Sequence, residues 1–179
     1  MRHIMLDLET LSSRNNAAIV AIGAVRFDLE TFQLGEEFYK VVDPSSCQKL
    51  KLHIDARTVI WWMNQSEEAR EIFSDRVKKD NIKNALAEFS YFVRESDPNP
   101  LIWGNGATFD NVIIRTAYEM CNFPIPWSHR QNVCYRTIRK MFPHERVEEG
   151  VLHNALQDAK NQAQTMIQIF RDLKGNFVA

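Results

Sequence analysis

The sequence lacks several features that mark specialised classes of protein. Its 179 residues contain three cysteines, Cys47, Cys121 and Cys134, which are widely spaced and include no CxxC pair. This pattern argues against a disulfide framework or a zinc site and is typical of a reducing compartment. No leader-like segment precedes the first expected strand, and no apolar run approaches the roughly 18 residues of a membrane span. We therefore expect a cytoplasmic protein without a membrane segment.

The sequence also has no excess of charge of either sign. It contains 22 Lys and Arg against 23 Asp and Glu, a formal net charge of −1. A dedicated nucleic-acid-binding protein usually carries a basic excess, so composition alone does not indicate such a partner. Hydrophobic residues at 45% and charged residues at 25% exclude a disordered, collagen-like or coiled-coil chain. At about 150 residues per domain, we expect one domain spanning residues 1–179.

The order of the expected elements predicts an α/β fold. Residues 3–9, 17–29 and 36–43 have the composition of strands, and their short connections indicate an antiparallel three-strand meander. A turn is expected at 43–46. The later elements are helices at 56–64, 67–73, 82–95, 108–121 and 154–173, a strand at 101–103, and a short strand and helix within 132–141. Strands followed by alternating strands and helices indicate a mixed sheet flanked by helices.

We expect Asp55 to cap the helix at 56–64, which contains two adjacent tryptophans. Val59, Trp62 and Met63 form its apolar stripe, which leaves Trp61 more exposed because consecutive helical residues lie about 100° apart. An exposed tryptophan can stack on a nucleobase, contact a second subunit, or lie at the rim of the core. The sequence leaves these three interpretations open.

The first segment with chemical potential lies on the first strand. Side chains alternate across a strand, so Asp7 and Glu9 emerge on one face while Leu6 and Leu8 point to the other. Two neighbouring carboxylates on a buried strand repel each other, and a hard divalent cation with oxygen ligands would compensate. The alternative is that the strand end is solvated and the pair lies in water.

The second segment, WGNGATFD at residues 103–110, joins a strand to a helix. Gly104 and Gly106 permit a tight turn and close approach of the backbone. Asp110 falls in the first turn of the helix, where the macrodipole favours a carboxylate without any catalytic role. A functional carboxylate and helix stabilisation are therefore both consistent with this position.

The third segment, at residues 153–159, opens the last helix. If Asn154 caps the helix, His153 precedes it on a loop and can turn toward Asp158. The small Ala155 and Ala159 allow this turn to lie close against a sheet. The alternative is an acidic first turn beside an exposed histidine.

Together, in this order, the three segments resemble the DEDDh 3′→5′ exonucleases of the ribonuclease-H-like superfamily. The resemblance extends from Asp7 to Asp158 and implies a ribonuclease-H-like mixed sheet with parallel strands beside the meander. Residues 53–70, HIDARTVIWWMNQSEEAR, are similar to the mycobacterial exoribonuclease-like subgroup and its phage and prophage relatives.

The resemblance also implies a mechanism, in which four carboxylates hold two Mg²⁺ ions, replaceable by Mn²⁺, and a histidine is the general base. The five residues are Asp7, Glu9, Asp110, Asp158 and His153. An unperturbed imidazole titrates near working pH, which suits this role. In the family pattern Asp7 bridges both ions. The substrate would be the 3′ end of single-stranded nucleic acid or a 3′ overhang, preferably RNA.

Relatives hold the terminal nucleotide with residues that follow the DxE segment. Here these are Thr10 and Leu11, with Phe109 and Trp61 as further candidates for substrate binding. Homodimers are expected from the relatives. A DNA exonuclease in replication or repair remains an alternative, because the active-site pattern does not distinguish ribose from deoxyribose. A non-catalytic nucleic-acid-binding module is a second alternative, against which the complete set of five residues argues.

Overall fold

The computed structural model describes residues 1–178, and its strands form a five-stranded sheet in the order β3-β2-β1-β4-β5. The strands are β1 (His3–Thr10), β2 (Ile19–Asp28), β3 (Gln33–Val41), β4 (Leu101–Gly104) and β5 (Asn132–Cys134). The first three pair antiparallel, whereas β4 and β5 run parallel to β1 and β4 respectively. The predicted mixed sheet, with a meander and parallel strands, is confirmed.

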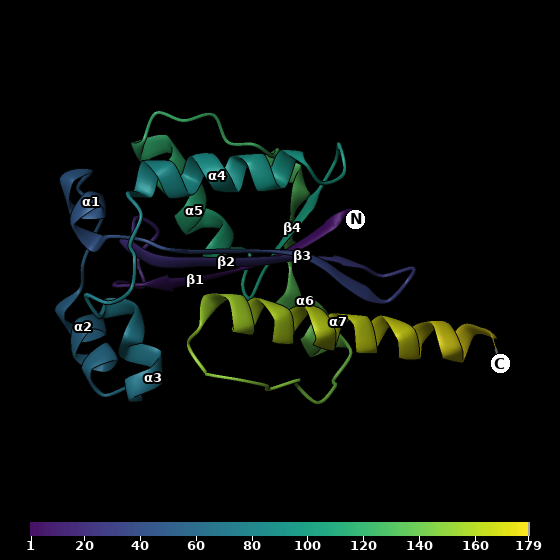
Figure 1. Cartoon of the computed structure of the whole chain (residues 1–179). Coiled ribbons are helices and arrows are strands. Elements are labelled where there is room, and N and C mark those ends of the chain that lie inside the picture. Colours follow the sequence, from purple (N-terminus) through teal and green to yellow (C-terminus); the bar gives the residue numbers. More distant parts are fainter. Residues whose placement is uncertain (179) are drawn as a thin grey trace.

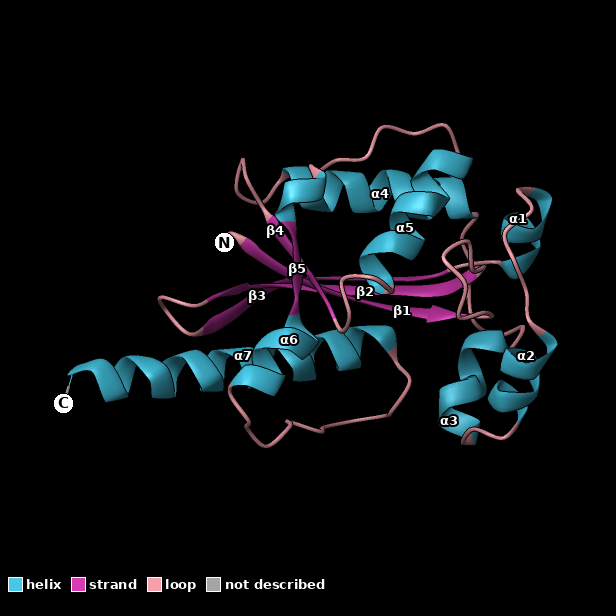
Figure 2. Ribbon diagram, turned by 180° about the vertical axis from the view of Figure 1, so that it is seen from behind, coloured by secondary structure: helices cyan, strands magenta, loops and turns pink. Residues whose placement is uncertain are grey.

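Helices cover both faces of this sheet. The α-helices are α1 (Pro44–Lys49), α2 (Ala56–Met63), α3 (Glu67–Arg70), α4 (Ile82–Arg94), α5 (Asp110–Met120), α6 (Tyr135–Met141) and α7 (Ala155–Val178). Short 3-10 helices lie at Glu71–Phe73 and His129–Gln131. Helices α4 and α5 lie on one face, and α6 and α7 on the other (Figures 1 and 2). Helices α2 and α3 lie beyond one end of the sheet, near the start of α7.

Alternation along β1 divides its side chains between two hydrophobic cores. Ile4, Leu6 and Leu8 join the core beneath α4 and α5, and Met5 joins the core beneath α7. Residues that continue the Met5 face therefore point to the α7 side. This places Asp7 and Glu9 on one face, as predicted.

The turn expected at 43–46 and the bounds of the last helix differ from the sequence-based expectations. The expected turn at 43–46 is the start of α1: the Asp43 side chain accepts a hydrogen bond from the Ser45 backbone N–H, and Pro44 occupies the first helical position. Proline is tolerated there because the first helical N–H has no intrahelical partner. The last helix begins one residue later than predicted and continues to Val178 rather than ending near residue 173.

Helix α2 begins at the predicted cap, since the Asp55 carboxylate accepts from the Arg57 backbone N–H at 2.8 Å. Its apolar stripe is narrower than predicted. Trp62 is 3% exposed, whereas Met63 is 68% exposed. The reason is that α2 lies at the end of the sheet rather than across its face, so only a narrow side of the helix is covered (Figure 1).

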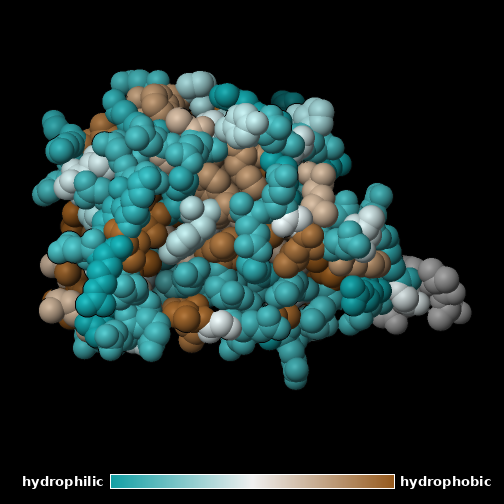
Figure 3. All heavy atoms as spheres, viewed as in Figure 1, coloured by the Kyte–Doolittle hydropathy of each residue, from teal (hydrophilic) through white to brown (hydrophobic). Residues whose placement is uncertain are grey.

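Figure 3 shows hydrophilic residues over most of one face, with hydrophobic residues in separate patches between them. Ile60, Trp61 and Met63 are exposed together on α2. Among the described residues, no helix has both the length and the apolarity required to cross a membrane.

Candidate active site

A cleft of about 310 Å³ lies on the α7 side of β1. Asp7 and Glu9 line it from the strand, and His153 and Asp158 line it from the start of α7. Four of the five residues singled out from the sequence therefore border one cavity. They come from opposite ends of the chain, so the cleft depends on how closely α7 packs on the sheet.

Gly23 permits this close packing. It lies on β2 directly opposite Asp7, and a Cβ at this position would stand 2.1 Å from the backbone carbonyl carbon of Ala155. The first turn of α7 therefore rests directly on the backbone of β2, which brings Asp158 to the cleft. Sequence reasoning did not identify Gly23, although a single glycine within an apolar strand can indicate close backbone approach.

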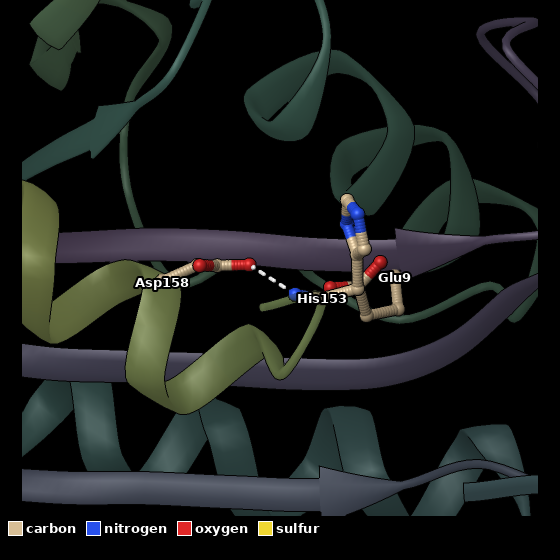
Figure 4. A group of neighbouring side chains, drawn as sticks. All are labelled: Glu9, His153 and Asp158. Atoms are coloured by element: carbon tan, nitrogen blue, oxygen red, sulfur yellow. Dashed lines mark hydrogen bonds between the residues drawn. The ribbon is translucent and has the colours of Figure 1, made fainter. Parts of the chain in front are cut away.

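His153, Asp158 and Glu9 converge within the cleft (Figure 4). One potential ligand atom from each residue lies within 4.8 Å of the other two. The His153 backbone N–H donates to Asp158 Oδ2 at 3.1 Å, and the Asn154 side chain caps α7 by accepting from the Gln157 N–H. His153 adopts a positive φ of 61°, which turns the chain into the helix. The loop position predicted for His153 is confirmed.

Asp110 reaches the same region from the opposite side of β1. It is the first residue of α5 and only 2% exposed. A Cβ at Gly104 would lie 3.1 Å from Asp110 Oδ2, so the missing side chain at the end of β4 makes room for this carboxylate. Among the described residues, Oδ2 has no hydrogen-bond partner. Asp110 is not one of the three residues whose potential ligand atoms lie within 4.8 Å of one another.

The electrostatics of the cleft disfavour four ionised carboxylates. Burial raises the pKa of Glu9 to about 8, and the charges of Asp158 and Asp110 add to this effect. Burial and the charge of Asp110 also raise the pKa of Asp7 well above its usual range. Glu9 and Asp158 act on Asp7 in the same direction. A positive charge bound in the cleft would therefore stabilise the ionised form of these carboxylates.

The two remaining carboxylates follow the same logic. Burial raises the pKa of Asp110 to about 7, although nearby backbone N–H groups and the Arg136 guanidinium act in the opposite direction. Burial likewise raises the pKa of Asp158, and interactions with His153 limit the rise. Bound divalent cations would offset the cost of ionising these four buried carboxylates.

The donor set fits a hard divalent metal. Carboxylate oxygens are the ligands that Mg²⁺ and Mn²⁺ prefer, and a buried oxygen without a partner, Asp110 Oδ2, is available for coordination. Glu9 and Asp158 supply two further oxygens at the spacing of a shared ion.

Sequence reasoning missed a residue that supports the Asp7 carboxylate. Gln162 donates from Nε2 to Asp7 Oδ1 at 2.8 Å and lies one helical turn beyond Asp158 on the same side of α7. The i, i+4 spacing of these two polar residues on an otherwise apolar helix face was the available signal.

Two arginines also border the site. Arg146 lines the cleft directly. Arg136, from the basic run at 136–140, donates from Nη2 to the Asn105 carbonyl at 2.6 Å and packs over Gly106. A basic run on a helix usually faces solvent, so the sequence alone does not indicate this contact.

Thr10 and Leu11 lie beside the carboxylate cleft rather than on its wall. The Thr10 hydroxyl donates to the Ser12 carbonyl at 2.8 Å, and the Thr10 carbonyl accepts from Trp62 Nε1 at 2.9 Å. The Leu11 backbone N–H donates to the Ala18 carbonyl. The Leu11 side chain lines a second, apolar cavity of about 380 Å³.

The two aromatic candidates occupy different environments. Phe109 is half-buried and packs against the core beneath α4 and α5. Trp61 is 43% exposed, and its ring meets the His153 imidazole edge-on with centroids 4.9 Å apart. The sequence placed Trp61 on the exposed side of its helix but did not indicate this contact.

Comparison with known sequences identifies a matching family and a relative in a phage. The model of the Rv2179c-like 3′-5′ exoribonuclease domain matches residues 2–170. An exodeoxyribonuclease of enterobacteria phage T4 is 27% identical over 123 residues, which are 64% of this chain and 54% of the phage protein. The chain therefore spans about half the length of this relative.

Solved nucleases share the fold. The E. coli ExoI–single-stranded DNA complex, in its zinc-bound form, has a TM-score of 0.68 at 17% identity, covering 97% of this chain and 41% of that one. The nuclease domain of 3′hExo, a DEDDh family member bound to rAMP, has a TM-score of 0.62 at 11% identity, covering 95% and 92%. The family match covers nearly the whole sequence, and the folds agree. The chain belongs to the Rv2179c-like 3′-5′ exoribonuclease domain family and has the DEDDh exonuclease fold.

Proposed function

We propose that this protein removes nucleotides from the 3′ end of single-stranded nucleic acid or of 3′ overhangs by hydrolysing phosphodiester bonds, with RNA as the preferred substrate. The observation that carries the proposal is the convergence of Glu9, His153 and Asp158 in one cleft. Asp7 borders the same cleft, and Asp110 acts on it electrostatically. The family match supports the direction of degradation and is the reason for preferring RNA.

The four carboxylates would hold two Mg²⁺ ions, for which Mn²⁺ would substitute. When bound, such ions activate water and stabilise the charge that develops on the phosphate. Asp7 would serve both sites, and the charges of Asp110, Glu9 and Asp158 all act to raise its pKa, in agreement with its proximity to the other three acids. Glu9 and Asp158 would share one ion on the side of His153, and Asp110 would serve the other.

His153 would act as the general base. One ring nitrogen of His153 lies within 4.8 Å of a carboxylate oxygen of Glu9 and of Asp158, so a water bound beside those carboxylates would be within its reach. The imidazole would take a proton from that water as the oxygen attacks the phosphorus. The bond from the phosphorus to the 3′-oxygen of the preceding nucleotide would break, and that oxygen would take a proton from solvent. The hydrogen bond from the His153 backbone to Asp158 fixes the loop without occupying a ring nitrogen.

The substrate would lie across the cleft toward α2. Arg146 and Arg136 would contact phosphates of the substrate, because Arg146 lines the cleft and Arg136 is hydrogen-bonded to Asn105, which also lines it. The candidates for holding the terminal nucleotide remain Thr10, Leu11, Phe109 and Trp61. The apolar cavity beside Leu11 would receive the base.

DNA is the second candidate substrate, because the phage T4 relative is an exodeoxyribonuclease. The test is to incubate 5′-labelled single-stranded RNA and DNA of one sequence with Mg²⁺ or Mn²⁺, using Asp7→Ala as the control. We expect a ladder that shortens from the 3′ end, faster on RNA, and no ladder with the variant. If neither strand shortens, the proposed function is wrong. Equal rates would remove only the preference for RNA.

A homodimer is also proposed, on the basis of the exposed apolar residues Ile60, Trp61 and Met63 on α2. Sedimentation equilibrium of the wild type and of Met63→Glu tests this. A dimeric wild type and a monomeric variant would support α2 as the interface. A wild type that remains monomeric at micromolar concentration would exclude the dimer.

A further inference from the structure

His153 lies at the end of a long irregular segment. No helix or strand is present between the end of α6 at Met141 and the start of α7 at Ala155. The backbone N–H of His153 is tied to Asp158, but this bond leaves rotation about the side-chain bonds free. Among the described residues, no hydrogen bond from another side chain orients the imidazole. Its direction must therefore come from packing.

The packing is supplied by α2. The Trp61 and His153 ring centroids are 4.9 Å apart with the planes at 79°, and Trp62 stands 6.1 Å from the same imidazole at 77°. Edge-to-face contacts of this kind are directional, because the positive edge of one ring meets the negative face of the other. The imidazole thus packs against an aromatic wall formed by Trp61 and Trp62.

This wall is anchored to the strand that carries two of the acids. Trp62 is 3% exposed and donates from Nε1 to the Thr10 carbonyl at 2.9 Å, one residue after Glu9. Trp62 also packs edge-on against Trp61 at 5.1 Å and against Phe73 at 5.2 Å. A continuous contact therefore connects the end of β1 to the His153 ring through Trp62 and Trp61.

We propose that Trp61 is a positioning residue that holds the His153 imidazole toward the Glu9–Asp158 pair. The proposal rests on the role of His153 proposed above. Removing Trp61 would free the imidazole to rotate away while leaving the carboxylates and the other candidate substrate contacts in place. A displacement of about 1 Å at a reacting group can cost about 10²-fold in rate. We therefore expect Trp61→Ala to lower kcat by about 10- to 100-fold with KM nearly unchanged.

The first experiment measures kcat and KM on a single-stranded oligonucleotide. Trp61→Phe keeps an aromatic edge and is expected to retain most of the activity. Tyr91→Ala serves as the control, because Tyr91 is an exposed aromatic residue on α4 that does not line the cleft, and it should behave like the wild type. A rise in KM with unchanged kcat would overturn the proposal and assign Trp61 to base stacking instead.

The second experiment is a double-mutant cycle with His153→Ala. If Trp61 acts through His153, Trp61→Ala causes no further loss of kcat in the His153→Ala background. Equal losses in both backgrounds would overturn the proposal, because they would show that Trp61 contributes independently of the imidazole.

A third measurement does not depend on activity. The side-chain proton resonances of His153, assigned by comparison with His153→Gln, carry a ring-current shift from Trp61. Trp61→Ala should move them, whereas Tyr91→Ala should not, and both variants should bind Mn²⁺ as the wild type does. Unmoved resonances would overturn the positioning role. If the wild type degrades no nucleic acid, the proposed function fails. The resonances would still report whether Trp61 contacts the His153 ring.

Discussion

Gln162 on α7 donates a hydrogen bond to Asp7 on β1, with 2.8 Å between Nε2 and Oδ1. This bond joins the first strand to the last helix and leaves the other oxygen of Asp7 available. It also lowers the pKa of Asp7, against the effect of burial. A carboxylate oriented in this way is better prepared to bind a cation.

Replacing Gln162 by leucine should therefore weaken metal binding. Supporting residues around metal ligands typically contribute about 10- to 100-fold in affinity. We expect a loss in this range for Mn²⁺, measured by calorimetry. Gln168→Ala, farther along the same helix, is the control and should leave the affinity unchanged. Wild-type affinity in Gln162→Leu would show that the bond does not prepare Asp7.

Gly23→Ala should displace the first turn of α7. The new Cβ would stand 2.1 Å from backbone atoms of Ala155, which cannot move without moving the helix. Overpacking of this kind typically costs about 1–3 kcal/mol, and activity should fall because Asp158 moves with the helix. Urea unfolding measures the cost. Gly175→Ala, where an added Cβ meets nothing within 4 Å, should not destabilise the protein.

His153→Ala should keep the metal but lose most turnover. Removal of a general base typically costs about 10²- to 10⁴-fold in rate, whereas the four carboxylates remain in place. Single-turnover cleavage and Mn²⁺ calorimetry test the two parts separately. Activity near that of the wild type would contradict the assignment of His153 as the base.

The metal-free protein should lose stability as the pH rises. The pKa of Glu9 is about 8 and that of Asp110 about 7 in the folded protein, compared with about 4 for such groups in an unfolded chain. Between these values the folded state binds more protons than the unfolded state, so the free energy of unfolding decreases with increasing pH. The full stability is present below about pH 4, and the loss is complete above about pH 8.

Thermal unfolding between pH 5 and 9 in the presence of a chelator measures this loss. Added Mg²⁺ should reduce the slope, because the cation replaces the protons. Glu9→Gln should also show a shallower slope, since one titrating group is removed. A metal-free melting temperature that rises from pH 5 to 9 would contradict this account of the cleft.

Arg146→Ala should weaken substrate binding in a salt-dependent manner. If Arg146 contacts one phosphate, KM rises, and the slope of log KM against log salt concentration falls by about 1. Lys140→Ala is the matched control, because Lys140 is exposed on α6 and does not line the cleft. An unchanged slope in Arg146→Ala would place the phosphates elsewhere.

The sequence by itself determined that the side chains of the first two acids lie on the same face of β1. Alternation along an apolar strand places Asp7 and Glu9 on one face whatever packs against it. Local signals also predicted the start of α2 at Asp55, the helix that carries Asp110, and the cap before Asp158. These are properties of neighbouring residues, so a single sequence contains them.

Only the tertiary structure decided which groups meet across long separations. The contact of Trp61 with His153, the bond from Gln162 to Asp7 and the approach of α7 to Gly23 each join segments far apart in the chain. The same holds for Arg146 in the cleft and for Met63, which is exposed because α2 packs at the end of the sheet. Local periodicity predicts the direction of a side chain from its own element. The partner it meets depends on how separate elements pack, which periodicity does not specify.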